Sequence, residues 1–322
     1  MPAAPPLVVG LSGPTGSGKS ELALQLVQHL AAQQPVEIVS VDSVQVYRGM
    51  DIGTAKPSPA TRAQVTHHLI DIRDPAQSYS AGEFVRDARA AISAVHARGA
   101  LPLLVGGTML YLRALHDGLA QLPVASLPIR RQIEAQAAQY GWPAVHAELE
   151  RVDHAAAARI APQDAQRLQR ALEVYRLTGV PISQWQGSAD RHGAAPMRAQ
   201  YRWLRYARWP DSRADLRTRL QARFEAMLRA GLIDEVRTLY ARGDLTGQHP
   251  AMRAVGYRQL WSYCAGDISL EQAARLAVIA TAQLARRQLT WLRREPGITA
   301  LHGAPVGLLE ALITAICGPA RV

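Results

Sequence analysis

The chain has 322 residues, of which 48% are hydrophobic and 19% charged, as is typical of a soluble globular protein with a sizeable core and one or two domains. No apolar run reaches the length of a membrane span, and no basic residue precedes the first apolar stretch as in a signal peptide. The two cysteines, Cys264 and Cys317, lack metal-ligand spacing, which argues against a zinc site or thiol catalysis. We therefore expect a cytoplasmic protein.

A glycine-rich segment near the N-terminus fits the pattern G-x-x-x-x-G-K-[ST]. It follows an apolar run at residues 7–11 and precedes a helical pattern from Glu21, so the local order is strand, loop, helix. In such a loop the backbone NH groups form an anion site at a helix N-terminus, the Lys adds positive charge, and the Ser hydroxyl can bind Mg2+. The sequence therefore predicts a P-loop for a di- or triphosphate, formed by Gly13, Pro14, Thr15, Gly16, Ser17, Gly18, Lys19 and Ser20.

The chain has 36 basic residues, and only Lys19 and Lys56 are lysines. A Lys retained in the loop of an Arg-rich chain indicates that the compact ammonium is needed there. Lys56 is either a similar case or a surface lysine. The net charge of +10 arises almost entirely in residues 198–322. This placement suggests a polyanionic partner such as nucleic acid, although solvated arginine faces explain it equally well.

A second buried strand is expected at residues 36–41, and Asp42 follows it directly. Parallel sheets present functional residues at the carboxyl ends of their strands, so Asp42 is a site candidate, as either a catalytic base or a Mg2+ holder. Residues 45–57 are too polar and Gly-rich for a core element and too long for a minimal connection. They are typical of a binding loop.

Ser80 and Glu83 form a capping box for a helix that runs to about residue 98. A third buried strand follows at residues 101–105, and the Gly-Gly-Thr turn at residues 106–108 comes after it. Two glycines let a ligand approach the backbone, and Thr108 brings a hydroxyl to the same place. The alternative is that Thr108 serves only as the N-cap of the next helix.

From residue 117 the pattern changes to Ala- and Gln-rich helical segments interrupted by prolines, which predicts a helical insertion at residues 119–197. Strand character returns at residues 201–206, which we expect to rejoin the central sheet. The predicted fold is α/β: a P-loop NTPase-like parallel sheet flanked by helices, built from residues 1–118 and 198–322, with an all-helical insertion domain.

Two helices in the last third carry arginine clusters. The helix at about residues 212–230 places Arg219 and Arg223 on one face, where they form either a phosphate clamp or a solvated stripe. A last long helix begins at the capping box of Ser269 and Gln272 and mixes arginines with Trp291. That combination suits RNA backbone contacts with base stacking.

Together these segments resemble the tRNA dimethylallyltransferase family, also called the tRNA isopentenylpyrophosphate transferases, over nearly the whole chain. The most specific match is DSVQVYRGMDIGTAKP at residues 42–57. Further matches are the P-loop, LLVGGT at residues 103–108, QRLQRALE at 166–173, VGYR at 255–258 and RRQLTWLR at 286–293. Ala282 departs from the family, which usually carries a basic residue there.

The resemblance implies transfer of a dimethylallyl group from dimethylallyl diphosphate to N6 of the adenine on the 3′ side of the anticodon, in tRNAs that read codons beginning with U. It implies that Asp42 is the general base and that Thr108 orients the reacting groups. The P-loop, together with Arg223, would bind the leaving diphosphate rather than a transferred phosphoryl group. The implied cofactor is Mg2+, held by Ser20.

The same resemblance implies contacts with the anticodon stem-loop of tRNA, with the helical insertion closing over the stem. The contacting residues would be Asp42, Ser43, Val44, Gln45, Thr108, Arg130, Gln166, Arg167, Leu168, Gln169, Arg170, Arg253, Ala254, Val255, Gly256, Tyr257, Arg258, Arg286, Arg287, Gln288, Trp291 and Arg293. We expect a monomer with no membrane association and no protein partner.

Two other functions fit the loop. A nucleoside or nucleotide kinase would use the insertion as a lid and Arg219 with Arg223 as the phosphate clamp. A nucleic-acid-binding ATPase usually carries paired acids after a strand, whereas Ser43 follows Asp42 here. Consumption of ATP with a small phosphate acceptor is the observation that would favour the kinase.

Overall fold

The computed structural model describes residues 4–120, 122–187 and 196–317. The chain forms two compact units: Met1–His116 joins Arg198–Val322 in the first, and Asp117–Met197 makes up the second. We call them the sheet unit and the helical unit. In no part of the described chain is a helix long and apolar enough to span a bilayer.

The sheet unit is built on a six-stranded parallel sheet with the strand order β3-β2-β4-β1-β5-β6. The strands are β1 (Leu7–Ser12), β2 (Val36–Val41), β3 (His67–His68), β4 (Leu101–Gly106), β5 (Arg202–Arg208) and β6 (Thr299–Leu301). The predicted parallel sheet is confirmed, and so is the return of the chain to it at residues 201–206, because β5 pairs with β1.

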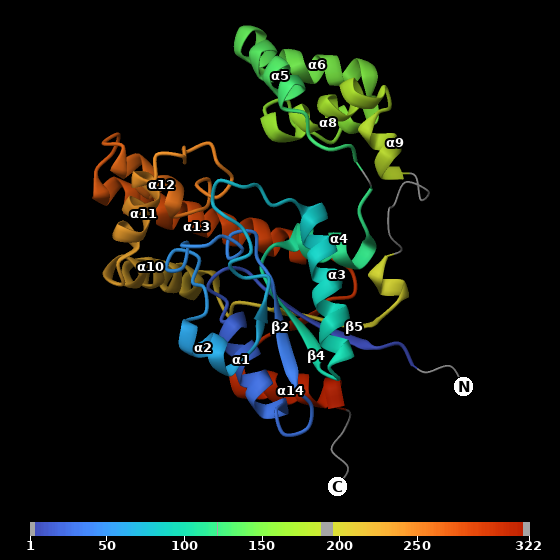
Figure 1. Ribbon diagram of the computed structural model, residues 1–322, viewed down its shortest axis with the longest axis vertical. Coiled ribbons are helices and arrows are strands. Elements are labelled where there is room, and N and C mark those ends of the chain that lie inside the picture. The colour runs from blue at the N-terminus through green and yellow to red at the C-terminus, as the bar shows by residue number, and fades with distance from the viewer. Residues whose placement is uncertain (1–3, 121, 188–195, 318–322) are drawn as a thin grey trace. The chain divides into compact units, whose positions relative to one another are not determined.

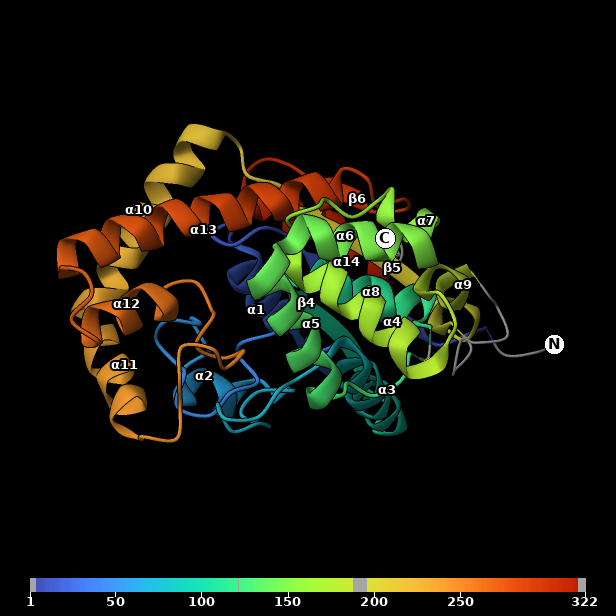
Figure 2. The same cartoon turned by 90° about the horizontal axis from the view of Figure 1, so that it is seen from above.

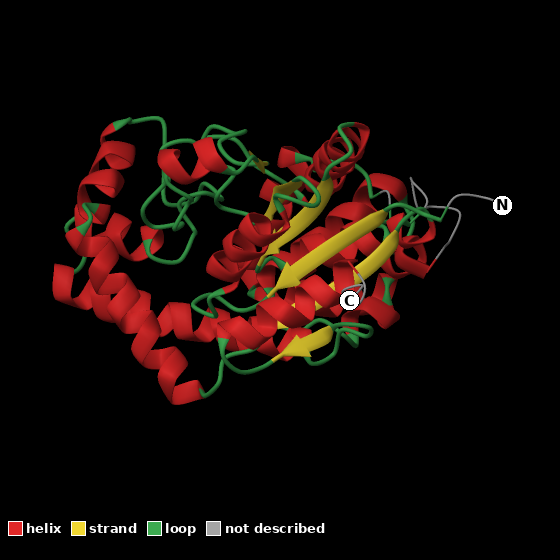
Figure 3. Ribbon diagram, turned by 90° about the horizontal axis from the view of Figure 1, so that it is seen from below, coloured by secondary structure: helices red, strands yellow, loops and turns green. Residues whose placement is uncertain are grey.

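Helices cover both faces of the sheet, as Figure 1 and Figure 3 show. Successive residues of a strand point to opposite faces. Val9 and Leu11 of β1 belong to the core that α1 (Lys19–Leu30) and α14 (Pro305–Cys317) complete. Gly10 and Ser12 point the other way, toward α4 (Met109–Asp117). β1, β2 and β4 are buried on both faces, which is why their sequences are nearly continuous apolar runs.

The carboxyl ends of three neighbouring strands meet at one edge of the sheet. Ser12 of β1 and Val41 of β2 both lie opposite Gly106 of β4 in the strand register. The segments that follow these ends are the P-loop, Asp42 and the turn that holds Thr108. The topology therefore brings together three predicted site segments that lie far apart in the sequence.

Four helices of the last third pack on one another within the sheet unit (Figure 2). They are α10 (Arg213–Arg229), α11 (Leu232–Ala241), α12 (Tyr257–Cys264) and α13 (Leu270–Leu292). Leu216 and Leu220 of α10 meet Ala285 and Leu289 of α13 in a small apolar cluster, and Ala282 packs at its margin. Ala282 thus contributes to the α10–α13 contact.

The remaining helices of this unit are α2 (Pro59–Gln64) and α3 (Ala81–Ala97). The predicted capping boxes are confirmed: Ser80 with Glu83 begins α3, and Ser269 with Gln272 begins α13. Neither β6 nor α14 was expected from the sequence. β6 has only three residues, and α14 is apolar along most of its length, so neither carries a clear periodic pattern.

The helical unit consists of helices around a core of its own. These are α5 (Leu127–Tyr140), α6 (Trp142–Val152), α7 (His154–Ala157), α8 (Ala165–Thr178), α9 (Ile182–Gly187) and the 3-10 turn η2 (Met197–Ala199) at its border. Its core includes Ile133, Val145, Leu149 and Leu172. The unit begins at Asp117, whereas the sequence placed the start of the insertion at residue 119.

Candidate active site

The loop between β1 and α1 has the backbone geometry of an anion site. Gly18 precedes α1 with φ 85°, and Gly16 has φ 76°, both in the left-handed region that other residues rarely adopt. At Gly16 a Cβ atom would also lie 2.7 Å from Leu220 Cδ2 of α10. The amides of the first helical turn have no intrahelical partners, so a loop with these glycines before the helix can accept an anion at the helix N-terminus.

Lys19 is the first residue of α1, and its Nζ donates to the carbonyl oxygen of Pro14 at 3.4 Å. Burial lowers the pKa of Lys19 to about 8; the Asp42 carboxylate acts to raise this pKa, and the Arg223 guanidinium acts to lower it. A bound diphosphate would add negative charge beside this ammonium and stabilise its protonated form.

Asp42 directly follows β2, and its carboxylate is oriented by the backbone. Oδ1 accepts hydrogen bonds from the NH groups of Val44 at 2.9 Å and Gln45 at 3.3 Å. Within the described ranges Oδ2 has no hydrogen-bond partner. One carboxylate oxygen is therefore fixed, and the other can accept a proton from a substrate.

Thr108 links the ends of two strands beside Asp42. Its Oγ1 accepts the NH of Ser43 at 3.1 Å, and its own NH donates to the carbonyl oxygen of Val41 at 3.2 Å. The Thr108 side chain is half-buried and lies next to the residue that follows Asp42. The structure thus brings the two predicted catalytic residues, Asp42 and Thr108, together.

Arg223 of α10 is close enough to Asp42 and Lys19 for their charges to interact. Its side chain is half-buried, and burial lowers its pKa while the Asp42 carboxylate acts to raise it. Arg219, one turn earlier, is exposed. Of the two predicted clamp arginines, Arg223 is therefore the one that acts on Asp42 and Lys19.

Lys56 holds the loop that follows Asp42. Its side chain is only 2% exposed, and Nζ donates to the carbonyl oxygen of Tyr47 at 2.8 Å. The same ammonium pairs with Asp51 at 2.5 Å and Asp71 at 2.6 Å. Lys56 is therefore a buried structural lysine and not a surface one.

Glu235, in the first turn of α11, binds the same loop although it lies 184 residues after Asp51 in the sequence. Oε2 accepts the backbone NH groups of Asp51 at 2.8 Å and Ile52 at 2.7 Å. Oε1 accepts the NH of Gly53 at 3.2 Å and the hydroxyl of Tyr257 at 2.5 Å. Glu235 was not expected from the sequence, since its only local signal is an acid in a first helical turn.

Tyr257 is fully buried, and burial, followed by the charge of Glu235, raises the pKa of its phenol. A Cβ atom at Gly53 would lie 2.5 Å from its ring, so the loop packs directly on it. The Tyr257 side chain is therefore engaged in holding the loop, and the predicted tRNA contact of this residue stays a prediction for its backbone. In the same segment, Arg253 and Arg258 are exposed.

Among the predicted RNA-contacting residues at residues 286–293, some side chains are exposed and others make hydrogen bonds within the protein. Arg286, Arg287 and Arg293 are exposed. Trp291 is half-buried, and its indole NH donates to Glu295 Oε2 at 3.2 Å. Gln288 faces inward and contacts the P-loop.

In the helical unit, a buried carboxylate holds two predicted tRNA-binding arginines. Glu173 Oε1 accepts the NH of Ser126 at 2.7 Å and Nε of Arg130 at 2.9 Å, and Oε2 pairs with Arg170 at 2.6 Å. Burial acts to raise the pKa of Glu173, but these hydrogen bonds more than offset it and lower the pKa. The pairing fixes both arginines while leaving each partly exposed.

The neighbouring residues of α8 behave differently from one another. Gln166 and Arg167 are exposed, and Gln169 donates to Glu134 at 2.8 Å. Leu168 is completely buried in the core of the helical unit. The Leu168 side chain therefore packs in the core, since an amphipathic helix buries one face, and the predicted tRNA contact of this residue stays a prediction for its backbone.

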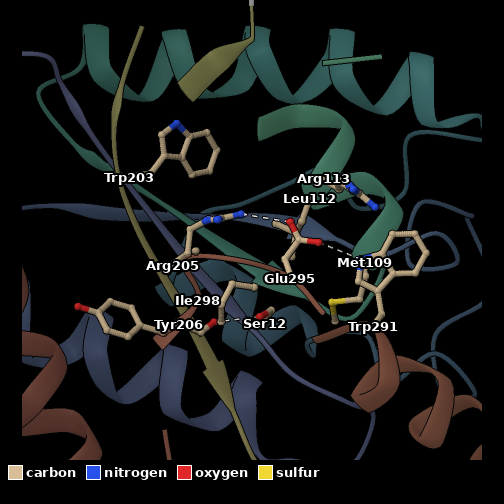
Figure 4. Close-up of a pocket in the computed structure, with 11 residues that line it drawn as sticks. Ser12, Met109, Leu112, Arg113, Trp203, Arg205, Tyr206, Trp291, Glu295 and Ile298 are labelled. Atoms are coloured by element: carbon tan, nitrogen blue, oxygen red, sulfur yellow. Dashed lines mark hydrogen bonds and ion pairs between the residues drawn. The ribbon is translucent and has the colours of Figure 1, made fainter. Parts of the chain in front are cut away.

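A small cavity lies inside the sheet unit between β1, α4, β5 and the end of α13 (Figure 4). Met109, Leu112, Trp203 and Ile298 contribute apolar lining. Arg205 and Glu295 pair with each other at 3.5 Å. Of the predicted site residues only Trp291 lines this cavity, so it does not coincide with the cluster around Asp42.

Comparisons with known proteins show the family of the chain. The model of the IPP transferase family matches residues 45–295. The chain is 55% identical over 293 residues to a tRNA dimethylallyltransferase of Bordetella pertussis, with 91% of each chain covered. It is 56% identical over 302 residues to one of Thioalkalivibrio sulfidiphilus, covering 94% of this chain and 91% of that protein.

A solved structure is similar as well. The tRNA isopentenylpyrophosphate transferase of Bacillus halodurans matches with a TM-score of 0.68 and 34% sequence identity, covering 97% of this chain and 96% of that one. The family resemblance seen in the sequence motifs is thereby confirmed. With a family match over most of its length and relatives above 50% identity, the chain belongs to the tRNA dimethylallyltransferase family.

Proposed function

We propose that the protein transfers a dimethylallyl group from dimethylallyl diphosphate to N6 of the adenine on the 3′ side of the anticodon, in tRNAs that read codons beginning with U. The product is N6-isopentenyladenosine. The observation that carries the proposal is the cluster of Asp42, Lys19 and Arg223, in which one carboxylate lies among cations suited to a diphosphate. Relatives at 55% and 56% identity that are named tRNA dimethylallyltransferases support it.

Asp42 acts as the general base. The amine of adenine is a weak nucleophile because its lone pair is delocalised into the ring, so removing its proton as the new bond forms lowers the barrier. The N6–C1 bond forms, the C1–O bond to the diphosphate breaks, and the N6 proton passes to Oδ2 of Asp42. The amides of Val44 and Gln45 hold Oδ1 and orient the carboxylate for this step.

The P-loop stabilises the leaving group. Charge develops on the diphosphate as the allylic C1–O bond breaks, and prearranged donors at that point stabilise the transition state more than the ground state. The amides at the start of α1, the ammonium of Lys19 and the guanidinium of Arg223 supply such donors. Thr108 keeps Ser43, and with it Asp42, against the end of β4.

The residues of the loop fit Mg2+. Mg2+ takes oxygen ligands and is commonly shared between one protein group and substrate phosphates. Ser20, the residue after Lys19, is exposed, and among the described residues the buried Oγ of Ser17 has no hydrogen-bond partner. Ser20 would hold the ion, which would neutralise charge on the diphosphate.

The tRNA reaches the site with its target base displaced from the stack, because a stacked adenine cannot present N6 to a carboxylate at a sheet edge. Exposed arginines of the sheet unit suit the RNA backbone, namely Arg253, Arg258, Arg286, Arg287 and Arg293. The excess positive charge of residues 198–322 accords with this use.

The test is transfer of label from dimethylallyl diphosphate to unmodified tRNA, with Mg2+ present or chelated, followed by mapping of the modified nucleoside. Label on the adenine beside the anticodon, lost on chelation, is the expected result. Absence of label, combined with ATP consumption when small nucleotides are added, would replace the proposal with a kinase.

A further inference from the structure

Gln288 of α13 joins two segments that are far from it in the sequence. Its Oε1 accepts the backbone NH of Thr15 in the P-loop at 2.9 Å. Its Nε2 donates to the carbonyl oxygen of Gly107, the residue before Thr108, at 2.8 Å. One amide side chain therefore connects the diphosphate loop to the turn that holds Thr108 beside Asp42.

The backbone around Gln288 is shaped to admit its amide. A Cβ atom at Gly107 would lie 2.5 Å from Nε2 of Gln288 and 3.2 Å from the carbonyl oxygen of Gly13. Only a glycine at this position lets the two turns and the amide approach so closely. The close contact with Gln288 therefore explains why residue 107 is a glycine, and this reason was not visible in the sequence.

The helix holds Gln288 rigidly in place. One residue on, Leu289 packs with Leu216 and Leu220 of α10, and Leu220 also touches the P-loop at Gly16. One turn later, Leu292 packs with Met109 beside Thr108. Ala285, one turn before Gln288, belongs to the same cluster as Leu289. Because apolar contacts hold α13 both before and after Gln288, its amide is a fixed point and not a mobile surface group.

We infer that Gln288 is a positioning residue for the diphosphate: it holds the first half of the P-loop against the Gly107–Thr108 turn, and it is not primarily a tRNA contact. With the Thr15 amide occupied, the loop keeps one shape, and the later amides of the loop stay directed at the anion. The leaving diphosphate and Asp42 are thereby kept in a constant relation, on which the rate of transfer depends. The inference rests on the proposed function.

The test compares Gln288→Met with Gln283→Met. The first removes both hydrogen bonds at nearly constant size, and the second makes the same change at an exposed position of the same helix. Two dissociation constants are measured on the full chain: that of inorganic pyrophosphate with Mg2+ by calorimetry, without RNA, and that of unmodified tRNA by filter binding. Thermal melting controls for folding.

We expect Q288M to weaken pyrophosphate binding about tenfold, since two hydrogen bonds that fix the loop are lost, and to raise the KM for dimethylallyl diphosphate similarly. Its tRNA affinity should stay within about twofold of that of Gln283→Met, which should match the unmodified protein in both measurements. Unchanged pyrophosphate binding with weakened tRNA binding would overturn the inference and make Gln288 an RNA contact.

A second variant covers the case in which Q288M does not fold. Gln288→Glu has the same size and keeps an acceptor for Thr15, but it loses the donor to Gly107 and places a negative charge beside the loop, so its pyrophosphate binding should be weaker than that of the unmodified protein by more than about tenfold. If it stays unchanged, the inference fails. The proposed function is judged separately, by label transfer with the unmodified protein, which does not depend on either variant.

Discussion

Glu235 offers the sharpest structural prediction, because one carboxylate accepts four hydrogen bonds from a loop and a buried tyrosine. In Glu235→Ala these donors lose their acceptor. Water can replace the carboxylate at the exposed Asp51 amide, and the Ile52 amide is left out as well, so the Gly53 amide and the Tyr257 hydroxyl alone set a lower bound on the loss. At the lower end of the range for hydrogen bonds to a charged group, about 1.5 kcal/mol each, the loss is about 3 kcal/mol.

The assay is thermal unfolding of the full chain. For a unit of this size, about 1 kcal/mol corresponds to about 2–4 °C, so Tm should fall by about 6–12 °C. Glu235→Gln should lose about half as much, because its oxygen can keep the Asp51 and Ile52 amides while the Tyr257 hydroxyl turns to accept from the new NH2 group.

Asp234→Ala is the matched control. Asp234 is the neighbouring acid on α11, and it pairs with Arg237 in an exposed position. An exposed pair contributes little, so Tm should change by no more than about 1–2 °C. If Glu235→Ala and Asp234→Ala lowered Tm equally, the carboxylate would not anchor the loop, and the reasoning would be refuted.

Three further predictions concern the site. Asp42→Asn should keep tRNA affinity and lower turnover by about a hundredfold or more, because the base is lost; near-normal single-turnover rates would contradict this. Thr108→Ala should also slow the single-turnover rate, and a normal rate would remove Thr108 from the chemistry. The pKa of Lys19 is about 8 without ligand, so the ammonium is present below that pH and must gain a proton on diphosphate binding above it. The dissociation constant for dimethylallyl diphosphate without RNA should therefore rise by up to about tenfold per unit above pH 8 and stay flat below it. A flat profile through pH 9.5 would refute the assignment.

Local patterns were sufficient for much of the fold. The P-loop, the capping boxes at Ser80 and Ser269 and the apolar strands lie within a few residues of sequence, and spacing and residue type determine them. The position of Asp42 at a strand end followed from the same patterns, because a parallel sheet collects such ends at one edge. The segment at residues 42–57 was the most specific match to the family.

Tertiary structure decided which side chains are available to a substrate. Leu168 and Tyr257 lie in segments that match the family, yet the core buries both. Lys56 is buried because Asp51 and Asp71 approach it from either side. Burial of a single helical residue depends on which face meets its neighbours, and a short motif does not specify this.

The sequence by itself determined a P-loop, a parallel sheet and an acid at its edge, because these depend on residues adjacent in the chain. Only the fold could connect Gln288 with Thr15 and Glu235 with the loop at Asp51. Each of these contacts joins residues more than 180 positions apart, and their hydrogen bonds form only after β1, α11 and α13 have packed. The physical reason is that a polar side chain needs a partner within the protein only where packing shields it from water, and packing depends on residues far apart in the sequence.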